Sequence, residues 1–300
     1  MNRSIRTALQ CAGLLGLFHG AAAFAGPIID QTLPADAHGT VEISNRSGTV
    51  HCVGWDKPEV QIGGKLDGSA QRLDVQHEGS TVSIRVVMNS PTVHFSGDAD
   101  LIVKVPAASM LRISGVSADI EVHGITGEQK LQSVSGNVQT EAASADLELK
   151  SISGNVKARG KSANLRTTVS TVSGNVELTD LGGELDLDMV SGAAEIDMDS
   201  VSRARLRSIS GEVVMTGHLA KDAHIDVSSV SGNMRMRWFG AENANADVES
   251  FSGEINACFG NTEVQQPKYG MGSSWRRAVQ GASSDIHIKT MSGDVNICNR

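Results

Sequence analysis

Apolar and polar residues alternate on both sides of a Ser-Gly pair that recurs from the middle of the chain onward. In one copy, Leu149 lies four residues before Ser153, while Val156 and Ala158 follow that serine and are separated by Lys157. Alternation with a period of two is typical of a β-strand that buries one face. Each copy therefore predicts two short strands, one before and one after the glycine.

The copies follow one another at nearly constant intervals. The recurring serines, separated by steps of 18, 20, 18, 19, 21, 21 and 40 residues, are Ser135, Ser153, Ser173, Ser191, Ser210, Ser231, Ser252 and Ser292. Ser117, 18 residues before the first of them, begins a degenerate copy. A lone hairpin cannot bury its apolar face, whereas copies stacked about 4.8 Å apart cover one another. The sequence therefore predicts an all-β fold, a single-stranded β-solenoid of about nine coils with two strands and about 20 residues per coil.

Two further columns of residues suit the corners of such a coil. The glycine after each serine fits a position that needs a positive φ or a close approach of backbone. Hydroxyl residues two places before the serine can hydrogen-bond the corner backbone. They are Ser133, Ser151, Thr171, Ser208, Ser229, Ser250 and Thr290. Because the Ser-Gly serine recurs in every coil, it predicts a structural role and not a catalytic nucleophile.

The segment that precedes the repeats is rich in strands but less regular. Short alternating runs at residues 82–86 and 101–105 are typical of strands, and Gly63-Gly64 and Asp67-Gly68 are turn signals. An exposed first coil would present unpaired backbone groups, so a stack needs a cap. We expect residues 26–110 to form this strand-rich N-terminal cap, and residues 111–300 to form the solenoid.

The N-terminus predicts export. Arg3 and Arg6 precede an apolar stretch over residues 8–18, and small residues end at Ala23-Phe24-Ala25, which is the order of a signal peptide cleaved after residue 25. A retained anchor would need roughly 20 apolar residues. Loss of the two arginines lowers the formal net charge from −8 to −10, which argues against nucleic-acid binding. We expect a periplasmic or extracellular chain with no membrane span after cleavage.

Several motifs together carry a resemblance to a known family. They are Val53-Gly54-Trp55-Asp56, Glu59-Val60-Gln61-Ile62, the strand from Leu101 to Pro106, the Ser-Gly repeats, and the closing Thr290-Met291-Ser292-Gly293-Asp294-Val295. In these the chain resembles the bacterial putative-adhesin family of exported β-strand-repeat proteins, a domain of unknown function. The resemblance implies a right-handed solenoid related in shape to the pectate-lyase type, with no established reaction. An insertion before the last repeat and a cysteine pair depart from the family pattern.

Cys258 and Cys298 occupy the same repeat position, six residues after Ser252 and Ser292. If their coils are adjacent, their Cα atoms lie about one strand spacing apart, inside the roughly 4.4–6.8 Å range of a disulfide. If residues 259–281 form a complete hidden coil, the two cysteines lie two spacings apart and cannot bond without movement. We predict the disulfide, which an oxidising compartment permits, and we expect Cys52 to be a buried hydrophobic residue.

The step of 40 residues before the last repeat contains turn-rich sequence. We interpret residues 259–281 as a loop that leaves the stack. It carries Tyr269, Trp275, Arg276 and Arg277, and these residue types are enriched at binding hot spots. The loop is a candidate partner contact; the alternative is that it folds over the end of the stack and shields it.

Outward acidic residues raise the question of catalysis. Asp186, Asp226 and Asp247 share a column with Arg205, and stacked acids could bind a cation or act as acid and base. The same column also holds Lys130, Glu148, Thr168 and His287, as expected of a solvated sheet face. The histidines lack ligand spacing, so the sequence predicts no catalytic residue, no cofactor and no metal.

The expected function is that of a non-enzymatic cell-envelope or secreted scaffold. Such a scaffold is adhesion-like or binds a partner, either an envelope protein or a glycan. Two alternatives stay open: a polysaccharide-active lyase or hydrolase on a β-helix, and a periplasmic partner of an envelope-stress regulator.

Overall fold

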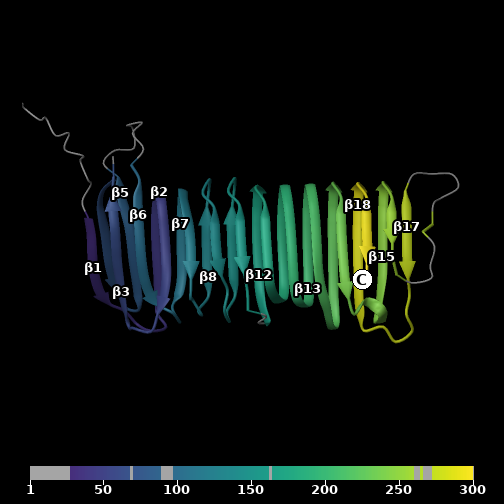
Figure 1. Cartoon of the computed structure of the whole chain (residues 1–300), viewed down its shortest axis with the longest axis horizontal. Coiled ribbons are helices and arrows are strands. Elements are labelled where there is room, and N and C mark those ends of the chain that lie inside the picture. Colours follow the sequence, from purple (N-terminus) through teal and green to yellow (C-terminus); the bar gives the residue numbers. More distant parts are fainter. Residues whose placement is uncertain are drawn as a thin grey trace, which may run out of the picture.

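The computed structural model of the chain describes residues 28–67, 70–88, 97–161, 164–259, 264–265 and 272–299, and for Gln71 only the backbone. The expected signal peptide, residues 1–25, lies outside the described residues. Strands stand side by side along the long axis of the molecule, from β1 at one end to β17 at the other (Figure 1). The all-β solenoid predicted from the repeats is confirmed.

The strands that precede the long central one are β1 (Ile28–Pro34), β2 (Thr40–Trp55), β3 (Glu59–Leu66), β4 (Ala70–Glu78), β5 (Thr81–Met88), β6 (Ala99–Pro106), β7 (Met110–His123), β8 (Gln129–Ser133), β9 (Val138–Glu141), β10 (Leu147–Ser151), β11 (Val156–Arg159) and β12 (Asn164–Ser173). The remaining elements are β13 (Val176–Ser231), β14 (Met234–Phe239), the 3-10 helix η1 (Ala241–Asn243), β15 (Ala244–Ser252), β16 (Ile255–Ala257), β17 (Ser273–Arg277), β18 (Ser284–Ser292) and β19 (Val295–Cys298). Strand β13 continues through the corners at Ser191 and Ser210, and at the first of these Ser191 stays in register with Ser173 of β12.

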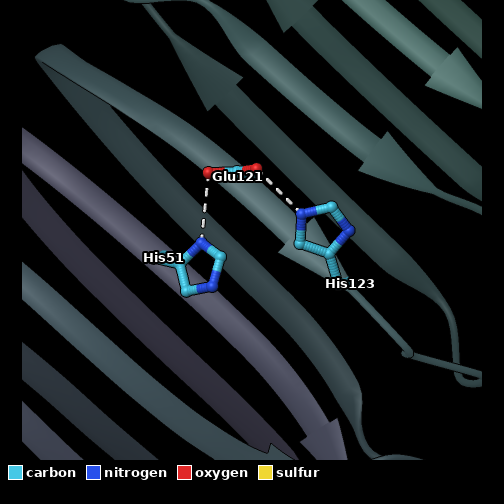
Figure 2. A group of neighbouring side chains, drawn as sticks. All are labelled: His51, Glu121 and His123. Carbon is cyan, nitrogen blue, oxygen red and sulfur yellow. Dashed lines mark hydrogen bonds and ion pairs between the residues drawn. The ribbon is translucent and has the colours of Figure 1, made fainter.

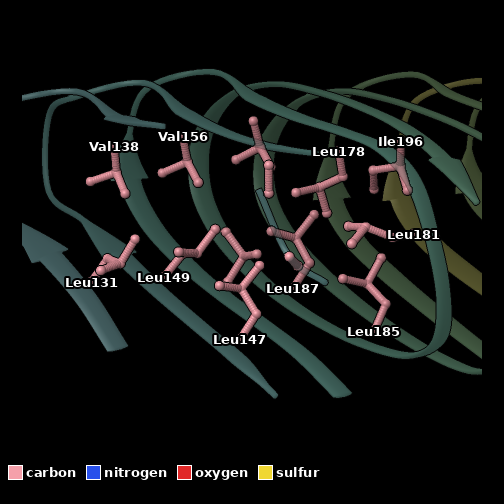
Figure 3. Packing of buried hydrophobic residues seen from close by; sticks show 14 of the residues in the cluster. Leu131, Val138, Leu147, Leu149, Val156, Leu178, Leu181, Leu185, Leu187 and Ile196 are labelled. Atoms are coloured by element: carbon pink, nitrogen blue, oxygen red, sulfur yellow. The ribbon is translucent and has the colours of Figure 1, made fainter. Parts of the chain in front are cut away.

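Two parallel sheets face each other across the interior. The strands before the corner, β8, β10, β12 and the following part of β13, align Leu131, Leu149, Val169 and Leu187 in register. The strands after the corner, β9, β11 and β13, align their first valines in the same way. Figure 3 shows these aliphatic side chains pointing from both sheets into the space between them. The core is therefore a continuous tube built from one thin layer per coil.

Polar side chains tie each corner to the next. The backbone N–H of Gly154 donates to the Ser151 hydroxyl at 2.8 Å, as the hydroxyl column predicted. One residue after the glycine, the side-chain oxygen of Asn137 accepts the backbone N–H of Asn155 at 3.0 Å, and Asn155 accepts that of Asn175 in turn at 3.0 Å. Such asparagine ladders add a bond between coils where the chain turns.

The glycine column lies where successive coils approach most closely. A Cβ atom on Gly154 would lie 1.9 Å from the carbonyl oxygen of Gly136, and one on Gly211 would lie 1.9 Å from that of Gly192. Gly211 also has a φ of 138°. The close approach of backbone, more than the dihedral angle, therefore excludes any side chain at this corner.

The N-terminal segment continues the stack instead of forming a separate cap. Strand β2 is itself a coil, since it pairs in parallel with β7 from Thr40 to Val53, and β5 and β6 pair in parallel with its other edge. The antiparallel strands β4, β3 and β1 then close this end. The expected boundary near residue 110 thus falls inside one continuous tube, because parallel pairing extends across it.

The C-terminal coil is inserted between two earlier coils. Strand β18 pairs in parallel with the end of β13 on one edge and with β15 on the other, and β19 lies between β14 and β16 in the same way. In Figure 1 the yellow β18 accordingly lies among green strands. The spatial order of the coils therefore differs from their sequence order at this end.

The inserted position of the C-terminal coil also changes the structural role of residues 259–281. This segment carries the chain past β15, forms β17 antiparallel to the outer edge of β15, and returns to the inserted coil. Among its described residues, 273–277 are thus a capping strand and not part of a loop that leaves the stack. An edge strand covered in this way no longer offers unpaired backbone groups to another chain.

Cys258 and Cys298 form a disulfide, with their Cα atoms 4.7 Å apart. Their coils are neighbours because β16 pairs with β19, up to the register pair Ala257 and Ile297 immediately before the cysteines. The bond therefore fastens the inserted coil to the coil that lies outside it.

Replacing Gly154 with alanine should destabilise the protein by about 1–3 kcal/mol or more, because the new methyl group meets backbone that cannot retreat without breaking the stack. Chemical denaturation measures the change. Gly63→Ala is the matched control, since a Cβ atom at Gly63 would have its nearest neighbour 3.8 Å away, and it should alter stability by well under about 1 kcal/mol. Equal stability of the two variants would contradict the close-packed corner.

Removing the disulfide with Cys258→Ser and Cys298→Ser together should lower stability by about 3–5 kcal/mol, because the bond closes a loop of 40 residues. Denaturation with and without reductant measures this effect. Reductant should destabilise the wild type and leave the double variant unchanged. If the reduced wild type, with both thiols free, is as stable as the oxidised wild type, the disulfide makes no such contribution.

Candidate functional site

One apolar side chain per coil points into solvent immediately before the corner serine. We name this column the apolar ridge. Its members, in spatial order, are Val116, Val134, Ile152, Val172, Val190, Ile209, Val230, Met291 and Phe251. They are between 39% and 59% exposed, and neighbours stand one strand spacing apart, so the ridge runs for about 40 Å. Contiguous apolar surface of this kind is typical of an interaction site.

A groove of about 720 Å³ accompanies the ridge from Val134 to Ile209. Its floor consists of the small hydroxyl residues of the corner column, including Ser151 and Thr171, which are buried. Ile152 and Val172 form one wall, and polar residues such as Lys150 form the other. A second hollow of about 470 Å³ repeats the arrangement at the C-terminal end. The site is thus an elongated trough with one apolar and one polar wall.

The ridge ends abruptly at the N-terminal side. The next strand in the stack, β2, has Arg46 between the register pairs Asn45 with Gly115 and Ser47 with Ser117. Exposed Arg46 thus takes the place next to Val116, and a charge replaces the apolar side chain.

The expected partner-contact residues do not form one surface. Trp275 is fully buried against Phe259, with ring centroids 5.3 Å apart, because β17 turns its side chain into the end of the tube. Arg277 donates to the backbone carbonyl oxygens of Ala241 and Glu242, and so it holds η1 in place. Tyr269 lies outside the described residues.

Arg276 alone of the described candidates is exposed. Its guanidinium bonds Asp247 at 3.0 Å and Glu249 at 2.7 Å. It also lines the second hollow, beside Phe251 and Met291. Arg276 therefore belongs to the polar wall of the trough.

Two aspartates of the outward acidic column, Asp186 and Asp247, lie beside arginines. The guanidinium of Arg207 lies 3.7 Å from a carboxylate oxygen of Asp186, and Asp247 pairs with Arg276 at 3.0 Å. The inserted coil places His287 in register between Asp226 and Asp247. These two acids, expected in neighbouring coils, therefore stand two strand spacings apart, about 9.6 Å.

A cluster of two histidines and a glutamate is the feature that sequence reasoning missed. His51 Nδ1 lies 3.1 Å from one carboxylate oxygen of Glu121, and His123 Nε2 lies 2.8 Å from the other, as Figure 2 shows. His123 Nδ1 also lies 3.4 Å from a Glu141 oxygen. Seventy residues separate His51 from Glu121, and only the register of β2 against β7 brings them together.

These contacts shift two pKa values in opposite directions. The pKa of Glu121 is lowered, chiefly because its carboxylate accepts a hydrogen bond from His123 and a second one from His51. The pKa of His123 is raised, chiefly by its hydrogen bond to Glu121 and further by Glu141. The cluster thus favours an ionised carboxylate beside a protonated imidazole.

Cys52 is completely buried in the N-terminal part of the core, as expected. Burial raises the pKa of its thiol to about 12. The thiol therefore stays protonated and unreactive, because nucleophilic chemistry requires the thiolate.

No helix among the described residues is both long and apolar enough to cross a bilayer.

The parallel coils, the glycine corners and the exposed residues define a β-solenoid that presents an apolar ridge flanked by two hollows. Residues 38–298 match the model of the Toastrack DUF4097 family, and the chain belongs to that family. The resemblance noted from the sequence is thereby confirmed. No curated protein matches the chain.

Several solved structures match the chain at low identity. A "putative cell adhesion protein" from Clostridium sporogenes is 9% identical, with a TM-score of 0.25, and the match covers 91% of this chain and 100% of that one. A "putative lipid binding protein" from Parabacteroides distasonis is 11% identical, with a TM-score of 0.38 and coverage of 91% and 97%. A "putative adhesin" from Bacteroides fragilis is 12% identical, with a TM-score of 0.33 and coverage of 90% and 97%.

Glu121→Gln should lower the pKa of His123 towards its ordinary value of about 6.5, because the main hydrogen bond that stabilises the imidazolium loses its charge. NMR titration of the imidazole measures the shift. Glu177→Gln, on another coil, should leave His123 unchanged. An unaltered His123 pKa in the Glu121 variant would contradict the contact.

The same pair gives the protein a pH window of added stability. The His123 contribution is complete below about pH 6.5 and is lost as the pH rises through its raised pKa. The Glu121 contribution is complete above about pH 4.3 and is lost as the pH falls through its lowered pKa. The two therefore act together between about pH 4.3 and 6.5. Since both side chains are partly exposed, solvent screening keeps the effect small.

Proposed function

We propose that this chain is a non-enzymatic, adhesion-like scaffold, exported to the periplasm or the cell exterior, which binds a protein partner along the apolar ridge. The observation that carries the proposal is the ridge itself, nine coils long and uninterrupted. Burial of such a surface by a partner removes apolar area from water, which is the main driving force of protein association.

The ridge favours a protein over a glycan as the partner. Eight of its nine members are aliphatic or methionine side chains, and Phe251 is its single aromatic residue. The repeat of about 4.8 Å also matches the spacing of β-strands, so a β-rich partner would present its own side chains at the same interval. The polar wall, with Lys150, Asp188 and Arg207, offers both signs of charge for specificity at the rim.

Export is supported by two independent features. The N-terminal residues have the order of a signal peptide, and the disulfide between Cys258 and Cys298 suits an oxidising compartment. The rigid tube would then hold the ridge at a fixed orientation in the envelope. No reaction is part of the proposal, since Asp247 pairs with Arg276 and the inserted His287 separates Asp226 from Asp247.

Changing the centre of the ridge with Ile152→Ser, Val172→Ser and Val190→Ser together should reduce partner recovery at least tenfold. Crosslinking in the native envelope, followed by identification of the attached proteins, measures recovery. The fold should survive, because all three side chains are exposed and the buried core is untouched. Circular dichroism and thermal unfolding check this point.

The matched control carries Gln139→Ser, Lys157→Ser and Glu177→Ser, three outward residues aligned in register on the opposite sheet. This control should retain its crosslinked partners. Equal recovery from the ridge variant and the control would refute the proposal. Light scattering of the purified wild type tests separately whether the chain associates with a second copy of itself.

A further inference from the structure

Two imidazoles and a carboxylate meet on the outer face of the sheet that lies after the corner. His51 pairs in register with Glu121, and Val53 with His123, so all three side chains project from the same side of β2 and β7 (Figure 2). They follow the corner serines Ser47 and Ser117, whereas ridge residues precede such serines. The cluster is therefore separate from the trough and plays no part in the proposed function.

We propose that His51, Glu121 and His123 bind a divalent transition-metal ion, for which Zn²⁺ is the best match. Imidazole nitrogens and a carboxylate oxygen are among the preferred ligands of Zn²⁺, and two histidines with one glutamate form a known three-ligand set for this ion. A site made only of carboxylates would instead favour Mg²⁺ or Ca²⁺.

The distances suit chelation after a small adjustment. One ligand atom from each residue lies within 4.8 Å of the other two. His51 Nδ1 is 3.1 Å from one carboxylate oxygen of Glu121, and His123 Nε2 is 2.8 Å from the other. Ligand atoms around a tetrahedral Zn²⁺ at about 2.0–2.1 Å stand roughly 3.3 Å apart. The side chains are 39%, 49% and 31% exposed, so they have room to rotate and an ion can reach them from solvent. The hydrogen-bonded backbones of β2 and β7 fix the Cα positions of the three residues.

Glu141 supports the geometry from outside the ligand set. Its carboxylate lies 3.4 Å from Nδ1 of His123, the ring nitrogen that does not face Glu121. Histidines that bind metal commonly donate their second N–H to a carboxylate, which fixes the ring and leaves the other nitrogen for the ion. Glu141 is thus a positioning residue that orients Nε2 of His123 towards the site.

Local charge also favours a cation. Glu121 and Glu141 are both acidic, and the nearby Lys104 directs its ammonium group over the ring of Trp55, 5.6 Å from the centroid. Three protein ligands leave a fourth tetrahedral position open to water or to a donor from another molecule.

Isothermal titration of ZnCl₂ into the full chain without a polyhistidine tag tests the proposal. We expect one Zn²⁺ per chain, and thermal unfolding should shift to higher temperature when the ion is in excess. His51→Ala, Glu121→Gln and His123→Ala should each weaken binding at least tenfold. The matched control His224→Ala, an exposed histidine on a distant coil, should bind as the wild type does.

Two results would overturn the site. One is the absence of saturable binding at one ion per chain. The other is unchanged affinity in His51→Ala, because Glu121 and His123 would then bind alone as neighbours on one strand. Titration of Co²⁺ gives a second readout, since a tetrahedral complex with mixed nitrogen and oxygen ligands has visible absorption that the aqueous ion lacks. A His51→Ala variant that loses Zn²⁺ but keeps its crosslinked partners separates this proposal from the proposed function. A ridge variant that loses its partners but still binds Zn²⁺ does the same.

Discussion

The parallel register between coils is the constraint on which the rest of the structure depends. Each residue has its own counterpart about 4.8 Å above and below it, so every column must consist of residues that tolerate copies of themselves. Glycine satisfies this at the corner, where the carbonyl group of the neighbouring coil leaves no room for a Cβ atom. Asparagine satisfies it one place later, because each side-chain oxygen accepts the next coil's backbone N–H. The aliphatic columns satisfy it inside by covering one another.

This register explains the interior and the corners, but it does not require the apolar ridge. Exposed positions two residues earlier on the same strands are polar or charged, as Lys150, Asp188 and Arg207 show. A preference of strands for β-branched residues would account for valine and isoleucine, yet Phe251 and Met291 continue the column without being β-branched. Solubility favours polar residues at such positions. The proposed protein partner would account for an apolar column at these positions.

The sequence predicts most of the fold but little of the candidate site. Period-two alternation around Ser-Gly predicts the strands, the inward columns and the shared position of Cys258 and Cys298, because these depend on residues close together in one repeat. The same alternation places the residue before each serine outside, so the ridge could have been found by asking which outward column is apolar. The histidine cluster could not, because Glu121 and His51 meet only through the pairing of β2 with β7. Trp275 was misjudged since its aromatic type suits a binding surface and a buried cap equally.

Because the repeats are alike, their sequences do not specify the order in which the last coils stack. Asn233 accepts the backbone N–H of Asp294, and Asp294 accepts that of Glu254, so the side-chain ladder follows spatial order and ignores sequence order. Any coil can serve as the neighbour of any other, because their columns are equivalent. The disulfide does not decide between the two orders, since Cys258 and Cys298 would be adjacent in both. What decides is β17: it occupies the outer edge of β15 and buries Trp275 there, so the final coil has only the inner edge of β15 to join.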